Sequence, residues 1–422
     1  SYLRGNLPPI AKAMASATSG SVPLKTTLSA KGSRDPEGSA LTYAWTLQPS
    51  GKLLGTGEEL AATLEQPGNF SIELVVADAA GEKSSVSLPV VVGNTAPVVK
   101  IDQPQNGDFF EPGKKIDYTL SVVDAEDGAS SAKPLEFGMR TVVTSAFLPA
   151  DGKGEAIDPG LSLMRKSDCF NCHAIDGPLV GPALTAIADR YRKQPGIEEI
   201  LNKKVRLGGN GAWGEVPMLA HPQHTEDEVA IMLHWMLGLE AGKGGPTLTK
   251  GLQGQITAPN EKKPGSMIIE ALYTDLGSAP AGELVGKTTI ALRGPRLEAE
   301  DAEVNGPKIM GAKGASNKKA LGSTSHGHNI LFKDCNVSKV QSVTVRTAVG
   351  NAVTGSKVEV HLDSPSGPLV ATVEIPNTGG WDSWAETKAP LNAATGRHDL
   401  FVVLVNPGKS GLMNLDWVEF GF

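Results

Sequence analysis

The chain has 422 residues and a net charge of −7, and this acidic balance argues against a nucleic-acid-binding protein. Its length requires several domains, and its 49 glycines and 29 prolines are typical of a loop-rich chain. No apolar run is long enough to span a bilayer, so no transmembrane segment is expected.

Short β-prone segments separated by turn residues fill the first part of the chain, at residues 25–30, 41–47, 70–78 and 85–92. Their regular spacing predicts a β-sandwich. The stretches at 38–45 and 68–74 resemble a PKD (polycystic-kidney-disease type) domain, an Ig-like sandwich, which we place at residues 1–94. In such a domain Trp45 belongs to the core, and Asp35 and Glu37 form a turn rather than a calcium site.

A second set of β-prone segments is divided into two groups. Three segments at 98–101, 115–123 and 137–146 are too few for a sandwich of their own, and three more follow at 251–258, 266–273 and 287–292. We therefore predict one Ig-like sandwich split into residues 95–150 and 246–294, with residues 151–245 inserted in it. The alternative is two small β linkers.

The inserted segment contains Cys169-Phe170-Asn171-Cys172-His173, which has the spacing of a c-type haem attachment site. Two thiols three positions apart can each add to a vinyl group of one porphyrin, and the adjacent imidazole can reach the iron. A redox dithiol, or half of a zinc site completed by His221 and His224, remains an alternative.

The residues after this motif follow the order of a class I cytochrome c, an all-α domain. A Gly-Pro turn spans 177–184, a Gly-rich loop spans 208–218, and Thr225 and Glu228 form a predicted capping box before a helix that runs to Leu239. The resemblance implies one haem c with the following residues: Cys169 and Cys172 for covalent attachment, His173 and Met218 as iron ligands, Pro182 as hydrogen-bond acceptor for His173, and Trp213 beside a haem propionate.

Histidine and methionine ligation leaves no open coordination position, which favours electron transfer over oxygen chemistry. The other nearby methionines, Met232 and Met236, have the one-turn spacing of core residues, and Met164 precedes the motif. Cytochromes of this type acquire haem outside the bacterial cytoplasm, so a periplasmic or extracellular protein is expected. Because the chain begins at Ser1 without a signal region, we expect that a signal peptide or a larger segment precedes it.

Residues 295–422 resemble a family 6 carbohydrate-binding module, a β jelly roll, through the stretches 297–302, 379–384, 396–404 and 414–420. The resemblance implies a calcium ion bound by Glu298, Glu300 and Asp416, whose carboxylates are suitable ligands. It also implies a cleft for a polysaccharide or oligosaccharide. The candidates for this cleft are Phe332, Trp381 and Asn414, with Trp384 as an alternative.

No nucleophile elbow, P-loop or zinc-protease motif occurs, and His326, His328 and Asp334 are interpreted as loop residues. The order of modules resembles the C-terminal region of secreted bacterial PQQ-type sugar dehydrogenases, which implies an electron relay without catalysis of its own. The redox partner is then a sugar dehydrogenase domain or another cytochrome. Alternatives are a non-catalytic haem-bearing surface or adhesion protein, and a cytochrome that donates electrons to a separate polysaccharide oxidase.

Overall fold

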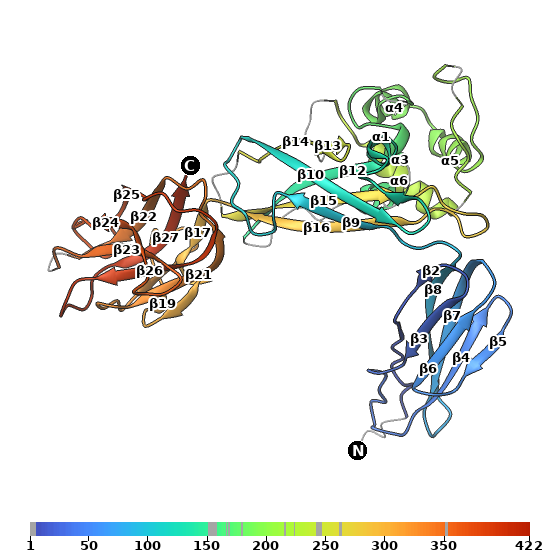
Figure 1. Cartoon of the computed structure of the whole chain (residues 1–422), viewed down its shortest axis with the longest axis horizontal. Coiled ribbons are helices and arrows are strands. Elements are labelled where there is room, and N and C mark those ends of the chain that lie inside the picture. Colours follow the sequence, from blue (N-terminus) through green and yellow to red (C-terminus); the bar gives the residue numbers. More distant parts are fainter. Residues whose placement is uncertain are drawn as a thin grey trace.

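The structure is a computed structural model that describes residues 6–150, 158–165, 167, 169–178, 180–214, 217–222, 224–241, 247–260, 264–350 and 353–422. Within these residues the chain is mainly β, as the sequence predicts, and all but one of its α-helices lie between residues 159 and 237 (Figure 1). Among the helices of the described residues, none is both long and apolar enough to cross a membrane.

The first unit is a two-layer β-sandwich packed around Trp45, which is fully buried. Its sheets have the orders β1-β3-β6 and β2-β8-β7-β4-β5. Its strands are β1 (Met14–Ala15), β2 (Ser19–Gly20), β3 (Leu24–Ser29), β4 (Thr42–Gln48), β5 (Lys52–Gly55), β6 (Glu59–Leu64), β7 (Gly68–Ala77) and β8 (Lys83–Val92). Four of them coincide with the expected segments, whereas β1, β2, β5 and β6 were not expected.

The second unit consists of two four-stranded sheets, and each combines strands from before and after the helices. In the first sheet β10 lies between β9 and β14 and also pairs with β11, and the second has the order β13-β12-β15-β16. The elements are β9 (Val98–Gln103), β10 (Lys115–Asp124), β11 (Gly128–Ala129), α1 (Pro134–Met139), β12 (Thr141–Pro149), β13 (Thr247–Lys250), β14 (Gln253–Thr257), β15 (Gly265–Thr274) and β16 (Val285–Arg293).

The chain leaves this sandwich at the end of β12 and returns to it at the start of β13. These two strands are antiparallel neighbours, and Ser145 pairs with Thr247. The helical segment therefore starts and ends on adjacent strands of one sheet, which is the geometry that an insertion requires. The exact bounds of the five predicted segments stay a prediction.

The inserted helices are α2 (Pro159–Arg165), α3 (Cys169–Cys172), α4 (Leu184–Tyr191), α5 (Ile197–Leu207) and α6 (Glu226–Leu237). The capping box predicted at Thr225 is confirmed, because its side chain accepts a hydrogen bond from the Glu228 backbone and the Glu228 side chain accepts one from Thr225. Helices α2 and α6 pack closely at Gly160, where a Cβ atom would lie 2.4 Å from the Ile231 carbonyl oxygen.

Apolar contacts and an ion pair attach the inserted helices to the central sandwich. Val142 of β12 is buried in the hydrophobic core of the helical segment, and Leu248 of β13 packs against the same core. Arg165 of α2 forms a 2.6 Å ion pair with Glu270 of β15, and the two side chains are only 7% and 17% exposed. The Arg165 guanidinium also donates to the Thr144 hydroxyl. Apolar contact and a buried charge pair thus both fix the orientation of the helices.

The C-terminal unit has two facing sheets, with the orders β19-β20-β27-β22-β25, where β17 also pairs with β27, and β18-β21-β26-β23-β24. Its elements are β17 (Arg296–Glu298), the 3-10 helix η1 (Ala299–Asp301), β18 (Glu303–Asn305), β19 (Lys308–Gly311), β20 (Lys319–Gly322), β21 (Asn329–Asn336), β22 (Ser342–Ala348), β23 (Lys357–Leu362), β24 (Leu369–Glu374), β25 (Trp384–Pro390), β26 (Arg397–Val405) and β27 (Asn414–Gly421). Aliphatic side chains from both sheets form one large core.

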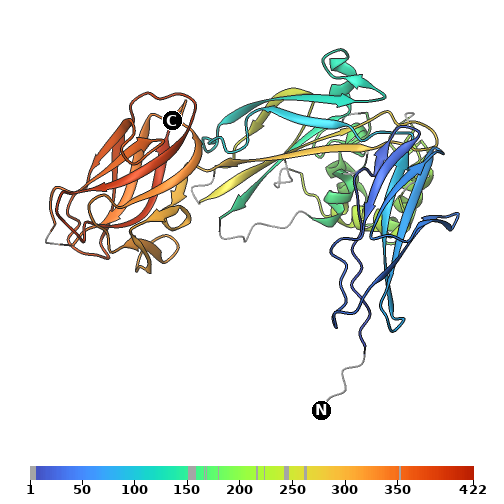
Figure 2. The same ribbon diagram turned by 60° about the horizontal axis from the view of Figure 1, so that its bottom comes forward.

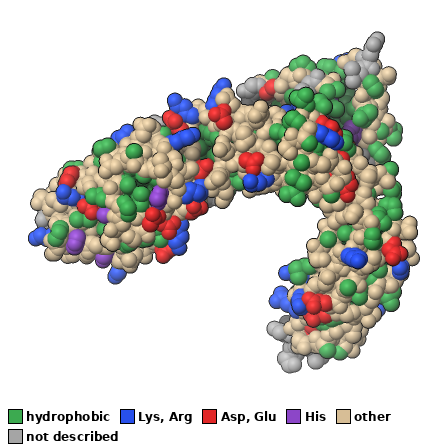
Figure 3. All heavy atoms as spheres, viewed as in Figure 1, with side chains coloured by type: hydrophobic (Ala, Val, Ile, Leu, Met, Phe, Trp, Pro, Cys, Tyr) green, Lys and Arg blue, Asp and Glu red, His purple; other side chains and the backbone are tan. Residues whose placement is uncertain are grey.

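Polar contacts join the central sandwich to both of its neighbours. Arg397 of the C-terminal unit forms a 2.6 Å ion pair with Asp108, and Phe109 packs on Phe420 with ring centres 5.4 Å apart. On the other side, the Asn94 side chain donates to the buried Asp275 carboxylate at 2.9 Å. Figures 1 and 2 show the sandwich between the two end units, and Figure 3 shows a bent outline with an open concave side.

The buried ion pair gives a prediction about stability. Replacing Glu270 with alanine leaves the Arg165 guanidinium buried without its carboxylate, so we expect a loss of about 3 kcal/mol or more in chemical denaturation. The matched control is Lys287→Ala, because Lys287 is half exposed and lies 3.5 Å from the same carboxylate. Its removal should cost less than about 1 kcal/mol. Equal losses in the two variants would contradict a structural role for the buried pair.

Candidate functional site

The two cysteines of the attachment motif lie on a single turn of helix, α3, which the His173 backbone extends by donating to the Cys169 carbonyl at 3.0 Å. Residues three apart in a helix share a face, so the two thiols lie on one side of the turn. Phe170 between them is 2% exposed and anchors the turn in the core. Both cysteines are half-buried.

His173 is held in one orientation by the backbone that follows it. Its Nδ1 atom lies 2.8 Å from the Pro182 carbonyl oxygen, the contact that the sequence predicts. Burial lowers the pKa of the His173 imidazole, and the Pro182 carbonyl acts in the opposite direction. An imidazole that donates through Nδ1 presents Nε2 as a lone-pair donor, which is the state that binds a metal.

Gly181 is a functional residue that sequence reasoning missed. A Cβ atom at this position would lie 2.6 Å from Cε1 of the His173 ring, so a larger residue would displace the imidazole from the Pro182 carbonyl. The Gly-Pro turn was recognised in the sequence, but the close approach of its backbone to the ring depends on the folded geometry.

Met218 lies in the loop between α5 and α6, where its backbone pairs with Gly209 through hydrogen bonds of 3.0 and 2.9 Å. Gly208, which ends α5, has a φ of +73°, and a Cβ atom there would lie 2.7 Å from the Met218 carbonyl oxygen. The loop therefore requires glycine at this position. Glu215 and Val216 of the predicted loop lie outside the described residues.

The other methionines near the motif are in the core, as the spacing of Met232 and Met236 predicts. Met164, Met232 and Met236 are 6%, 4% and 5% exposed and belong to the core of the inserted helices. Met218 is half-buried in its loop and is the better candidate for an iron ligand. Of the two histidines in the alternative zinc site, His224 lies 2.8 Å from the Ser167 hydroxyl and 3.5 Å from the Glu228 carboxylate.

Trp213 is 42% exposed and is packed by side chains of α4. The Arg190 guanidinium lies 4.7 Å from the centre of the Trp213 ring, and Arg190 Nη1 also donates to the Ala212 carbonyl at 2.7 Å. Tyr191 meets the same ring edge-on with centres 6.2 Å apart. This cation–π arrangement holds the Gly-rich loop against α4, and the expected propionate contact of Trp213 stays a prediction.

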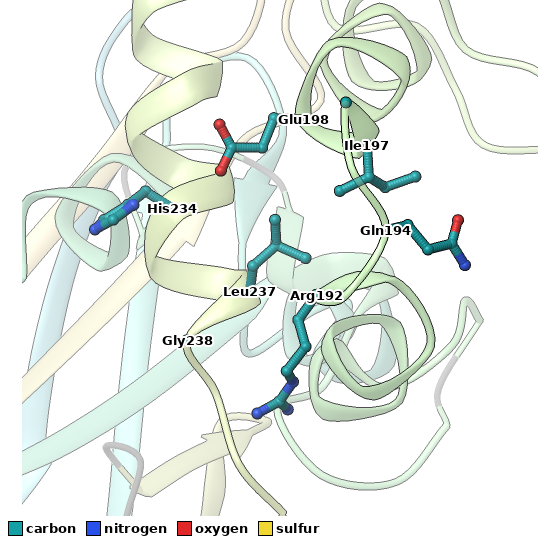
Figure 4. A pocket seen from close by; sticks show the side chains of 8 residues that line it. Arg192, Gln194, Ile197, Glu198, His234, Leu237 and Gly238 are labelled. Atoms are coloured by element: carbon teal, nitrogen blue, oxygen red, sulfur yellow. The ribbon is translucent and has the colours of Figure 1, made fainter.

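A surface hollow of about 410 Å³ lies elsewhere on the helical unit (Figure 4). It lies between the turn that joins α4 to α5 and the end of α6. Its lining includes Arg192, Ile197, Glu198, His234 and Leu237, and none of the predicted haem residues. The hollow is therefore separate from the candidate haem site.

Of the predicted calcium ligands of the C-terminal unit, Glu298 and Asp416 are buried and Glu300 is half-buried. Burial raises the pKa of the Glu298 carboxyl to about 7, and the charges of Glu300 and Asp416 act in the same direction, against a hydrogen bond from Ser316. Burial also raises the pKa of Glu300. Within the described residues, one carboxylate oxygen of Glu298 and one of Glu300 are buried without a hydrogen-bond partner.

These three carboxylates do not form a preformed metal site. Asp416 is engaged by the Arg346 guanidinium and by the backbone and hydroxyl of Ser316, which sequence reasoning missed. In the part of the chain that the structure describes, no group of three or more His, Cys, Asp and Glu side chains is arranged to hold a metal ion. The two orphaned oxygens of Glu298 and Glu300 nevertheless have the chemistry that a hard cation requires.

The structure separates the four predicted sugar-binding residues into three groups. Trp381 is 44% exposed, and its backbone carbonyl accepts a hydrogen bond from the Asn414 side chain at 3.1 Å. Trp384 is half-buried, with its Nε1 donating to the Lys313 carbonyl at 2.8 Å. Phe332 is 8% exposed and belongs to the core between the two sheets. The expectation for Phe332 is corrected, because a core side chain that is 8% exposed has too little free surface to stack on a sugar.

Comparisons with protein families agree with three of these units. Residues 6–92 match the PKD domain, residues 157–240 match cytochrome c, and residues 298–421 match the carbohydrate-binding module of family 6. All three domains are present in the chain. The cytochrome c match falls on the segment that contains α2 to α6, and the module match falls on the C-terminal sheets.

Individual proteins are similar to separate parts of the chain. Cytochrome c-551 of Azotobacter vinelandii is 38% identical over 80 residues, which are 19% of this chain and 96% of that protein. An arabinoxylan arabinofuranohydrolase of Paenibacillus polymyxa is 40% identical over 81 residues, which are 19% of this chain but only 13% of that enzyme. A solved family 6 module of Clostridium cellulolyticum in complex with xylose is 26% identical and covers 30% of this chain and 96% of its own, with a TM-score of 0.28.

Because the chain covers nearly all of a curated cytochrome at this identity, it belongs to the cytochrome c family through residues 157–240. That family implies a covalently bound haem c and electron transfer. The chain also carries a carbohydrate-binding module, whose family binds polysaccharides. PKD and carbohydrate-binding domains are typical of extracellular proteins.

Proposed function

We propose that this chain transfers single electrons through one haem c while its C-terminal module holds it on a polysaccharide. The observation that carries the proposal is the His173 imidazole, which follows the cysteine pair and is oriented by the Pro182 carbonyl at 2.8 Å. The haem would be attached at Cys169 and Cys172, with His173 and Met218 as iron ligands. When bound, it supplies a one-electron couple without an open coordination position.

The residues of the chain prepare this site in three ways. Pro182 fixes the tautomer and orientation of His173, and Gly181 leaves room for its ring. The backbone pairing of Gly209 with Met218 fixes the loop that carries the thioether. The apolar core around Phe170 and Leu184 excludes water from one side of the site. These features suit a protein whose site changes little between its two redox states.

The proposal extends to the position of this chain in a larger system. We infer that it is the electron-relay part of a secreted sugar oxidoreductase, acting outside the cytoplasm. This inference is supported by the resemblance of the module order and by the joints that tie the central sandwich to both neighbours. A sugar dehydrogenase domain, or another cytochrome, is the proposed redox partner.

The role of Met218 is tested by Met218→Ala in the haem-loaded chain. Loss of the thioether should lower the reduction potential and remove the weak Met-to-iron absorption band, because the thioether stabilises the reduced haem. The matched control is Leu219→Ala, since Leu219 is the neighbouring side chain and is 68% exposed. A band that persists in Met218→Ala would show that another residue is the distal ligand. A chain without a c-type spectrum would overturn the electron-transfer proposal itself.

Carbohydrate binding is assigned to the exposed face of Trp381, with Asn414 beside it. The flat apolar face of an indole suits the C–H face of a sugar ring, and Gly350 leaves room for it, because a Cβ atom there would lie 2.6 Å from the indole. Trp384 is the second candidate. Similar modules include one solved with xylose and another described as binding β-1,3-glucan, so xylan and β-1,3-glucan are the first ligands to test.

We expect Trp381→Ala to weaken binding to the preferred polysaccharide at least about tenfold, which corresponds to about 1.4 kcal/mol of lost contact. Affinity electrophoresis with the soluble polysaccharides measures this change. Leu369→Ala is the control, because Leu369 is equally exposed at 45% on the same unit. If both variants bind as well as the original chain, the sugar lies elsewhere on the module.

We also propose that the C-terminal module binds a calcium ion through Glu298 and Glu300, with Asp416 adding negative potential. The proposal is supported by the two buried carboxylate oxygens that have no hydrogen-bond partner in the described residues. Bound calcium would offset the cost of keeping these carboxylates charged in the interior.

Calcium should therefore stabilise the module, by about 2.7 kcal/mol when it is present at a hundredfold excess over its dissociation constant. Thermal unfolding with added calcium and with a chelator measures the effect. Glu300→Gln should abolish it, whereas Asp301→Asn, a change at the exposed neighbouring carboxylate, should retain it. Identical unfolding curves with calcium and with chelator would refute the site.

A further inference from the structure

Lys250 belongs to the sandwich, yet it lies on the sheet face that carries the inserted helices. It is the last residue of β13 and pairs with Val142 of β12. Cross-strand partners have their side chains on the same face of a sheet. Val142 is buried in the core of the inserted helices together with Phe170, the residue after Cys169. Lys250 therefore lies on the sheet face that carries α3.

The Lys250 ammonium has a hydrogen-bond partner in the host sandwich. Its Nζ donates to the Met139 carbonyl at the end of α1, at 3.4 Å. Burial lowers the pKa of Lys250, and a thiolate at Cys172, before haem attachment, acts in the opposite direction. The side chain is half-buried, so water and salt screen its charge less than they screen a surface lysine.

We propose that Lys250, a residue of the host sandwich, is an electrostatic part of the haem site and raises the reduction potential of the haem attached at Cys172. The inference rests on the proposed electron-transfer function. Reduction adds one electron to the ferric haem from an external one-electron donor and gives the ferrous haem, with no proton transferred. Because the site loses one positive charge in this step, a nearby fixed cation favours the reduced state.

Through Lys250, the insertion affects the reduction potential of the haem as well as its orientation. A free cytochrome c domain with the same ligands would lack this charge, since β13 lies outside the segment that matches cytochrome c. Lys250 acts on the haem through its charge and not by binding the iron, so it is a tuning residue rather than a ligand.

The test is a spectroelectrochemical titration of the full haem-loaded chain and its variants. We expect Lys250→Gln to lower the reduction equilibrium constant several-fold, where each tenfold corresponds to about 59 mV. Lys250→Arg, which keeps the charge, should retain the original value. Lys287→Gln is the control for a sandwich lysine whose partner is Glu270, and it should leave the potential unchanged.

Each outcome of this experiment is decisive. Equal potentials for Lys250→Gln and the original chain, with c-type spectra in both, would overturn the role of Lys250 alone. A colourless original chain would instead overturn the proposed function. If Lys250→Gln does not retain haem, Lys250→Met preserves the apolar stem and makes the same comparison. Loss of haem from both neutral variants, with full loading of Lys250→Arg, would assign Lys250 to haem retention and overturn the tuning role.

Discussion

The antiparallel pairing of β12 with β13 is the constraint on which the rest of the structure depends. Because these strands are neighbours, the two ends of the helical segment are held close together, as a compact cytochrome c fold can accept. The same two strands supply Val142 and Leu248 to the core of the helices. This one strand pairing therefore completes the sheet, holds the two ends of the inserted segment together and attaches the candidate haem site to the sandwich.

Two interactions with different effects attach the inserted helices to the central sandwich. Apolar contact of Val142 and Leu248 with the helices favours association but is tolerant of orientation. The buried pair of Arg165 with Glu270 adds little net stability over an apolar pair, yet any other orientation would leave a buried charge unmatched. The ion pair therefore contributes more to the orientation of the helices than to their affinity for the sheet.

Local signals in the sequence predicted local features well. The capping box at Thr225 follows from a short motif, the contact of His173 with Pro182 is implied by the resemblance to cytochrome c, and both are present. Side-chain contacts between distant segments were not predictable. Phe332 was placed in a sugar cleft because its neighbours in sequence resemble the family, whereas its burial is decided by the opposite sheet. Likewise, Ser316 meets Asp416 only because residues 100 positions apart are brought together by folding.

The joint between the central sandwich and the C-terminal unit has a consequence for chains on a solid surface. Arg397 bonds to Asp108 while Phe109 packs against Phe420, so both a charge pair and packed rings resist bending there. In a chain adsorbed through its C-terminal module, the central sandwich would keep a fixed orientation relative to that module. Its redox centre would then stand at a constant height above the surface, and the encounter rate would be set by the diffusion of the partner alone.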